Sequence, residues 1–337
     1  MRVRRATRFL VRQLQRVGLE SELILVEWNP PVDDALLIEQ LGPLPQGGCV
    51  QVRGIVVGQE HHLKFRGSQE WGMNPAAAAN VGLRRALGRF VSPKAADTYL
   101  SDEIVATLAR RDLAENVMYR CDRHDVVLGP DELKEIDDAA LLERLQSLES
   151  TPHDHLPPPP HWHIRDLHTN ACGDFLLMSG GLWHTVRGFP LDDTVLSLDC
   201  DSMIMHAAAA LGVREICLPA ACRVYKGTHA RLFSNRITQV FSPWQALIDN
   251  SLGSLRWWRW QTLARSTFDY PKRKVRGIES VLAPSIERHF VKPAEQWAQG
   301  ATPELHQPAD WGLGDCVLDE RILCRARWNT ASSAAVA

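Results

Sequence analysis

The spacing of apolar positions at the start of the 337-residue chain predicts an amphipathic helix. Four apolar side chains recur three and four residues apart, as on one face of a helix. They are Phe9, Leu10, Leu14 and Val17, and Gly18 follows in the position of a C-cap glycine. The first 19 residues also hold six arginines and no acidic residue, which is typical of organelle transit peptides. We favour a helix of the fold because the apolar stripe is regular and ends at a glycine.

The next hundred residues read as strands and helices in turn. Short apolar runs at 22–26 and 50–57 predict buried strands, and the second run is rich in β-branched residues. A helix is predicted between Asn74 and Gly88, because a proline lies near its start and alanines fill its interior. Phe90 and Val91 then resume an extended segment. Strand, helix and strand in this order predict an α/β fold with a parallel sheet and helices on its faces.

The rest of the chain divides at a proline-rich segment. Two helical stretches are expected within 102–148, with the polar segment 119–126 between them. Residues 152–160 hold five prolines and predict an exposed, stiff linker. We therefore expect two halves of the same domain, over 1–150 and 151–235, followed by a helical or irregular extension over 236–337.

Composition narrows the class of protein. The formal net charge of -2 gives no basic excess for binding nucleic acid. Eight scattered cysteines without a CxxC pair are expected to be reduced thiols of a cytoplasmic protein. No run of 18 apolar residues occurs, so no membrane span is expected, and only peripheral contact with a membrane is left open.

Four polar residues that follow apolar runs are the first candidates for chemistry. In an open parallel sheet, ligands bind beyond the carboxyl ends of the strands. Glu27, Asp97, Asp199 and His229 occupy such places. An isolated aspartate after a strand is commonly a turn former or a helix N-cap, so it is their order along the chain that points to a function.

The stretch 80–91 (NVGLRRALGRFV) is similar to the N-x-G-x-x-x-A-x-G motif of family 2 nucleotide-diphospho-sugar glycosyltransferases, which have the GT-A fold. The likeness covers most of residues 20–232, and it implies that 1–150 is the donor-binding half and 151–235 the acceptor or catalytic half of the domain. It implies a three-layer α/β/α sandwich with a mixed, mostly parallel sheet. It also implies transfer of a sugar, with inversion, from a nucleotide sugar to a hydroxyl of a glycan, lipid-linked or small-molecule acceptor.

On the donor side, the resemblance implies a divalent cation, Mn²⁺ or Mg²⁺. The family has a D-x-D motif after its strand, and residues 95–97 (AAD) keep only the last carboxylate, Asp97. His229 resembles the late histidine that completes the metal site in many members, and Lys226 could reach phosphate. Donor-binding residues implied by the resemblance are Glu27, which resembles the nucleoside contact, and Asn80, Arg85, Asp97 and Lys226.

On the acceptor side, residues 173–190 resemble the block of the family that carries a strand, a glycine-rich turn and an R-G-F step. This implies acceptor contacts at Gly173, Asp174, Trp183 and Asp201. The segment 198–201 (LDCD) is similar to the family's acidic element, which implies that Asp199 is the general base. Asp201 is expected to hold either the acceptor or the helix terminus, and the loop carboxylates Asp192 and Asp193 are weaker candidates.

Several features fit this interpretation less well. The family fold begins with a strand that this sequence lacks before its first helix, and Ala95 replaces an aspartate. The alternative is therefore a non-catalytic nucleotide- or glycan-binding remnant of the fold. A sugar nucleotidyltransferase is a third reading, but no glycine-rich basic loop is present near the start.

Three other groups of residues have a structural and a functional interpretation. Two H-x-H pairs suit a zinc site in an extended strand, although they lie in the proline-rich segment. They are formed by His153, His155, His161 and His163. Trp257, Trp258 and Trp260 could stack on sugar rings, but tryptophan clusters more often pack in a core or interface. The block 308–315 (PADWGLGD) resembles the C-terminal signature of bacterial relatives and suggests no chemistry.

Overall fold

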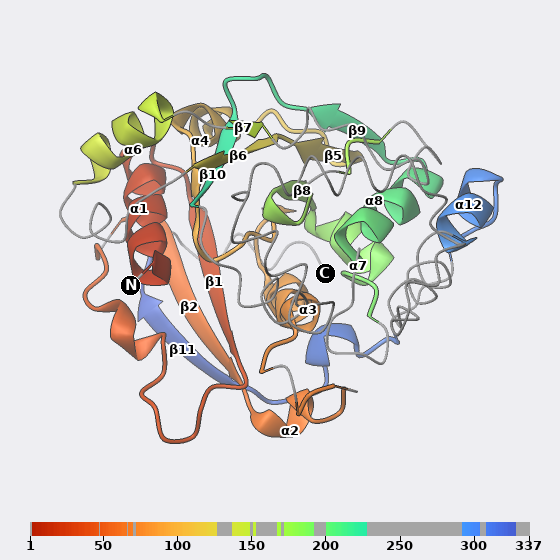
Figure 1. Ribbon diagram of the computed structural model, residues 1–337, viewed down its shortest axis with the longest axis horizontal. Coiled ribbons are helices and arrows are strands. Elements are labelled where there is room, and N and C mark those ends of the chain that lie inside the picture. The colour runs from red at the N-terminus through yellow and green to blue at the C-terminus, as the bar shows by residue number, and fades with distance from the viewer. Residues whose placement is uncertain are drawn as a thin grey trace, which may run out of the picture.

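The computed structural model describes most of the first 227 residues and two later segments. The described ranges are 2–46, 48–65, 67–69, 72–126, 137–148, 151–152, 167–169, 172–191, 200–227, 292–303 and 308–327. These residues form a mixed α/β structure with three hydrogen-bonded sheets and helices packed against them (Figure 1). The α/β class predicted from the sequence is confirmed.

The first sheet joins the beginning of the chain to its end (Figure 1). Strands β1 (Ser21–Trp28) and β2 (Val50–Val57) pair in parallel, and β11 (Asp319–Cys324) pairs antiparallel on the other side of β2. The sequence analysis predicted the first two strands but expected only helices and irregular chain after residue 236. Strand β11 begins with Asp319, Glu320 and Arg321 and is largely exposed. It was not predicted because it has the charged composition of an edge strand and no apolar run.

The other two sheets share continuous stretches of chain. One has the order β3-β8-β5-β9, with β3 (Phe90–Val91), β8 (Leu176–Ser179), β5 (Val117–Arg120) and β9 (Arg214–Cys217). The other has the order β4-β10-β6-β7, with β4 (Thr98–Leu100), β10 (Arg223–Gly227), β6 (Asp122–Val126) and β7 (Thr151–Pro152). Only Cys121 separates β5 from β6, so one extended segment runs through both sheets.

Strand pairing in these sheets is mixed. Among the described strands, three pairings are parallel and five are antiparallel. The mixed character is as expected, whereas the expected predominance of parallel pairing is not observed. The difference comes from β4, β7, β8 and β11, which lie next to strands that run in the opposite direction.

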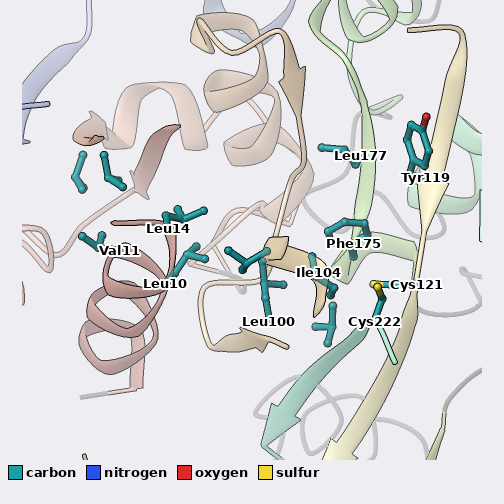
Figure 2. Close-up of a cluster of buried hydrophobic side chains, with 14 of the residues drawn as sticks. Leu10, Val11, Leu14, Leu100, Ile104, Tyr119, Cys121, Phe175, Leu177 and Cys222 are labelled. Carbon is teal, nitrogen blue, oxygen red and sulfur yellow. The ribbon is translucent and has the colours of Figure 1, made fainter. Parts of the chain in front are cut away.

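Helix α1 (Arg2–Arg16) is the helix predicted at the start of the chain, and its apolar stripe is buried. Phe9, Leu10 and Leu14 are each less than one-tenth exposed, while Val17 lies beyond the helix end and is partly exposed. Figure 2 shows Leu10 and Leu14 of α1 beside Leu100, in a cluster that continues to Phe175. This helix is therefore an integral part of the core.

Helix α3 (Pro75–Arg85) begins as predicted, because the side chain of Asn74 accepts a hydrogen bond from the backbone N–H of Ala77 at 2.9 Å. It ends at Arg85, three residues before the predicted Gly88. Its alanine face packs on one side of the first sheet, in a cluster of apolar residues from β1, β2 and the helix itself. The other edge of α3 packs against the sheet β3-β8-β5-β9, so this helix lies between that sheet and the first one.

The remaining helices complete the layers. The two stretches predicted within 102–148 are α4 (Asp102–Ala109) and α6 (Asp138–Ser147), and the segment between them forms β5 and β6. Further helices are α2 (Gln59–His62), α7 (Gly180–Val186), α8 (Cys200–Ala210) and α12 (Lys292–Ala298), which packs on α8. Short 3₁₀ turns lie at Glu39–Leu41, Cys172–Asp174 and Trp311–Leu313.

Two predictions from composition can be compared with this structure. None of the eight cysteines, all of which lie in the described ranges, forms a disulfide bond in this structure. Within the described ranges, no helix combines the length and the apolar character that a membrane span requires.

Candidate functional site

Charged side chains gather at the carboxyl ends of the parallel strands β6 and β10. Asp125 near the end of β6 lies opposite Lys226 of β10, and Lys226 lies opposite Thr98, the first residue of β4. The turn that precedes β4 is closed by hydrogen bonds from the backbone N–H and the hydroxyl of Thr98 to the carbonyl of Ala95. Residues 94–97 are therefore held at the same edge, which is where ligands bind in α/β sheets.

Asp174 lies at the centre of this group, which we call the charged cluster. Its Oδ2 accepts a hydrogen bond from Arg123 Nη1 at 2.6 Å, and its Oδ1 accepts one from Lys226 Nζ at 2.9 Å. The side chains of Asp174 and Arg123 are each 7% exposed. Burial acts to raise the pKa of Asp174, but Lys226 and Arg123 outweigh it and lower the pKa below its ordinary value. Asp174 is therefore ionised and shared by two cations.

Arg123 holds two carboxylates together. Besides Asp174, it contacts Asp125, with 3.1 Å between Arg123 Nε and the nearer carboxylate oxygen. Burial acts to lower the pKa of Arg123, but the two carboxylates outweigh it and raise the pKa. A guanidinium that spans two carboxylates fixes their geometry, so Arg123 stabilises the arrangement of the charged cluster.

Lys94 approaches the charged cluster from the segment after β3. Its side chain is half-buried, and Nζ donates a hydrogen bond of 2.9 Å to the carbonyl of Ala95. Burial lowers the pKa of Lys94 to about 8, the carboxylates of Asp97 and Asp174 act to raise it, and Lys226 acts to lower it. Near neutral pH, Lys94 thus carries a poorly solvated positive charge beside two carboxylates.

The structure brings together part of the predicted site. Asp97, Asp174 and Lys226 share the charged cluster, and Gly173 adjoins it. The sequence analysis missed Lys94, Arg123 and Asp125. Two signals could have indicated them. Lys94 lies three residues after the apolar pair 90–91, and the strand 122–126 (DRHDV) places charged residues where a buried strand is otherwise apolar.

Asn80 and Trp183 take part in hydrogen bonds inside the fold. The amide of Asn80 donates to the carbonyl of Phe189 at 2.8 Å and accepts from its N–H at 2.7 Å. Trp183 is fully buried and donates to the carbonyl of Val91 at 2.9 Å. The two segments that carry the resemblance, 80–91 and 173–190, are therefore hydrogen-bonded to each other.

Arg85 fastens the late segment 308–316 to α3. Its guanidinium donates to the carbonyls of Gly312 and Leu313, each at 2.7 Å, and pairs with Glu320 of β11 at 3.0 Å. Gly312 has a positive φ and lies so close to α3 that a Cβ there would be 2.4 Å from the carbonyl of Asn80. The segment 308–316 thus has a structural role, in which the guanidinium of Arg85 takes part.

Two of the predicted site carboxylates accept hydrogen bonds from backbone N–H groups. Glu27 accepts hydrogen bonds from the N–H groups of Leu37 and Ile38, at 2.6 and 3.0 Å. Asp201 accepts from the N–H groups of Gly173 and Ser202, each at 2.9 Å, at the start of α8. Of the two roles expected for Asp201, the structure has the helix terminus.

Other candidates lie outside the described residues. They are the predicted base Asp199, the predicted metal ligand His229, the loop carboxylates Asp192 and Asp193, the histidines 153, 155, 161 and 163, and the tryptophans 257, 258 and 260.

The described residues do not by themselves fit a divalent cation. In the part of the chain that the structure describes, no three His, Cys, Asp or Glu side chains gather as a metal site requires. Asp97 has Asp174 nearby, but both oxygens of Asp174 are used by Arg123 and Lys226.

Comparison with known proteins found no protein-family model and no curated protein that matches this chain.

Proposed function

We propose that the protein is a glycosyltransferase that moves a sugar from a nucleotide-diphosphate sugar to a hydroxyl acceptor. The observation that supports this function is the charged cluster at the carboxyl ends of β6 and β10. Donor residues at this edge would be Asp97 and Lys226, and Gly173 and Asp174 adjoin them on the acceptor side. The resemblance of segments 80–91 and 173–190 to family 2 glycosyltransferases supports the same reading.

In this proposal Asp199 is the general base. It directly precedes α8, whose first residue is Cys200. As the acceptor oxygen attacks the anomeric carbon, its proton passes to the carboxylate, and the bond to the departing nucleoside diphosphate breaks. Positive groups offset the charge that develops on the leaving group. A divalent cation remains a proposal that depends on Asp97 and His229.

A stability screen tests the donor first. The purified protein is heated with a panel of nucleotide sugars, in Mn²⁺ and in EDTA. A donor that binds only the folded state adds about 2.7 kcal/mol of stability at a hundredfold excess over its dissociation constant. If Asp97 holds a cation, Asp97→Ala abolishes the Mn²⁺-dependent part of this stabilisation. Unchanged Mn²⁺-dependent binding in that variant would refute the role of Asp97.

Asp199→Asn tests the reaction with the donor found in that screen. The variant keeps the shape of the side chain and its capacity to accept backbone hydrogen bonds, but it cannot take up a proton. Donor binding should survive, while the rate of transfer falls roughly 10²- to 10⁴-fold. Asp201→Asn is the matched control, because Asp201 accepts from backbone N–H groups at the same helix start. Full transfer activity in Asp199→Asn removes Asp199 from the mechanism.

A non-catalytic remnant that binds nucleotide or glycan is the second candidate. It is favoured by the use of Asn80, Trp183 and Asp201 in packing and backbone contacts. Tight donor binding without turnover in the wild-type protein, over a panel of glycan, lipid-linked and small-molecule acceptors, would support the remnant.

A further inference from the structure

The charged cluster holds ammonium donors that the described residues do not use. Lys94 Nζ donates to the carbonyl of Ala95, and Lys226 Nζ donates to Asp174, each at 2.9 Å. An ammonium group carries three donors. Among the described residues, each of these lysines therefore keeps two donors for another partner.

The two lysines reach the charged cluster from different segments, Lys94 from the turn between β3 and β4 and Lys226 from β10. Lys226 belongs to β10 and lies opposite Thr98, and Thr98 bonds the same carbonyl of Ala95 as Lys94 does. Lys94 interacts electrostatically with Asp97, Asp174 and Lys226. Both ammonium groups are thus placed at the edge where β6 and β10 end.

Charge and hydrogen-bonding capacity indicate an oxyanion as the ligand of these ammonium groups. A half-buried ammonium with one hydrogen bond is poorly compensated, and a ligand oxygen would complete its shell. The charge of Asp174 is already shared by Arg123 and Lys226, so its repulsion of an incoming anion is reduced. A phosphate group offers three or four acceptor oxygens and negative charge to two ammonium groups at once.

We propose that Lys94 and Lys226 bind phosphate groups of the ligand directly, without a divalent cation between the protein and the phosphate. The identity of that phosphate as the diphosphate of a nucleotide sugar rests on the proposed function. The phosphate site itself stands on the two lysines.

Calorimetric titration with inorganic phosphate in EDTA tests the site. The wild-type protein should bind phosphate, and Lys94→Met and Lys226→Met should each weaken the affinity roughly tenfold or more, since each removes a charge-assisted hydrogen bond. Lys64→Met is the control, because Lys64 is exposed on another part of the surface. If Lys226→Met fails to fold because Asp174 loses one of its two cations, Lys94→Met alone decides the matter.

The dependence on pH separates Lys94 from a general loss of charge. Between pH 8 and 9.5 the phosphate keeps its charge, whereas Lys94, faced by Asp97, Asp174 and Lys226, loses its proton. Wild-type affinity should fall roughly tenfold over this range, and the affinity of Lys94→Met should change much less. Equal pH dependence in both proteins overturns the role of Lys94.

Two further titrations in EDTA distinguish the source of the phosphate. Tighter binding of UDP or GDP than of pyrophosphate supports a nucleotide ligand, and equal binding indicates that the site takes free phosphates. Phosphate binding through the lysines without any sugar transfer would refute the proposed glycosyltransferase activity and leave the phosphate site supported. Sugar transfer that requires Mn²⁺, with no phosphate binding in EDTA, would refute the phosphate site and leave the glycosyltransferase activity supported.

Discussion

Replacing Lys94 by Met should stabilise the folded protein at neutral pH. The pKa of this amine is about 8 in the folded state, against an ordinary value of 10.5. Each tenfold change in proton affinity corresponds to 1.36 kcal/mol, so the charged lysine costs the folded state about 3 kcal/mol at pH 7. Methionine is unbranched and apolar, fills a similar volume and carries no charge.

The sign of the effect fixes its dependence on pH. Below pH 8 both states hold the proton, and the cost is present in full. Between pH 8 and 10.5 the unfolded chain binds more protons than the folded protein, so the stability of the wild-type protein rises with pH. The advantage of Lys94→Met should therefore decrease from about 3 kcal/mol at pH 7 to about 1.4 kcal/mol at pH 9.5.

Urea unfolding of the wild-type protein, Lys94→Met and the exposed control Lys64→Met, each at pH 7 and pH 9.5, measures this difference. The control should match the wild-type protein within about 0.5 kcal/mol at both pH values. A Lys94→Met protein that is less stable than wild type at pH 7 would refute the reasoning. A gain that is the same at both pH values would do so too. If Lys94→Met is more stable than wild type and no longer binds phosphate, this lysine serves ligand binding at the expense of stability.

Two other substitutions test the contacts around the site. Asp174→Asn removes the carboxylate that Arg123 and Lys226 share and should cost about 3–5 kcal/mol at pH 7. Because the pKa of Asp174 is lowered, the stability that its carboxylate contributes is present above about pH 4 and is lost as the pH falls. Acidification below pH 4 should therefore destabilise the variant less than wild type. An equal response to acid would contradict this. Arg85→Met removes the hydrogen bonds to Gly312 and Leu313, so limited proteolysis should cut within 308–318 faster than in wild type. Arg89→Met, which removes an exposed ion pair with Glu115, is the control and should leave the cutting rate unchanged.

The sequence by itself determined the local elements. The helix that contains Leu10 and Leu14, the strand 50–57 and the start of the helix after Asn74 follow from periodicity and capping, and these depend on residues close in the chain. The rule that polar residues after strands face the ligand edge also located Asp97, whereas Lys226 came from the family resemblance.

The tertiary structure alone decided which distant segments meet. Strand β11 lies beside β2 although its sequence is that of an exposed edge, and no local pattern marks its partner. Asp174 is ionised in the interior because Arg123 and Lys226, each about fifty residues away, surround it. The same holds for Asn80, whose amide is used by Phe189, 109 residues further on. Local spacing sets periodicity, but the partner of a buried polar group is chosen by packing across the whole chain.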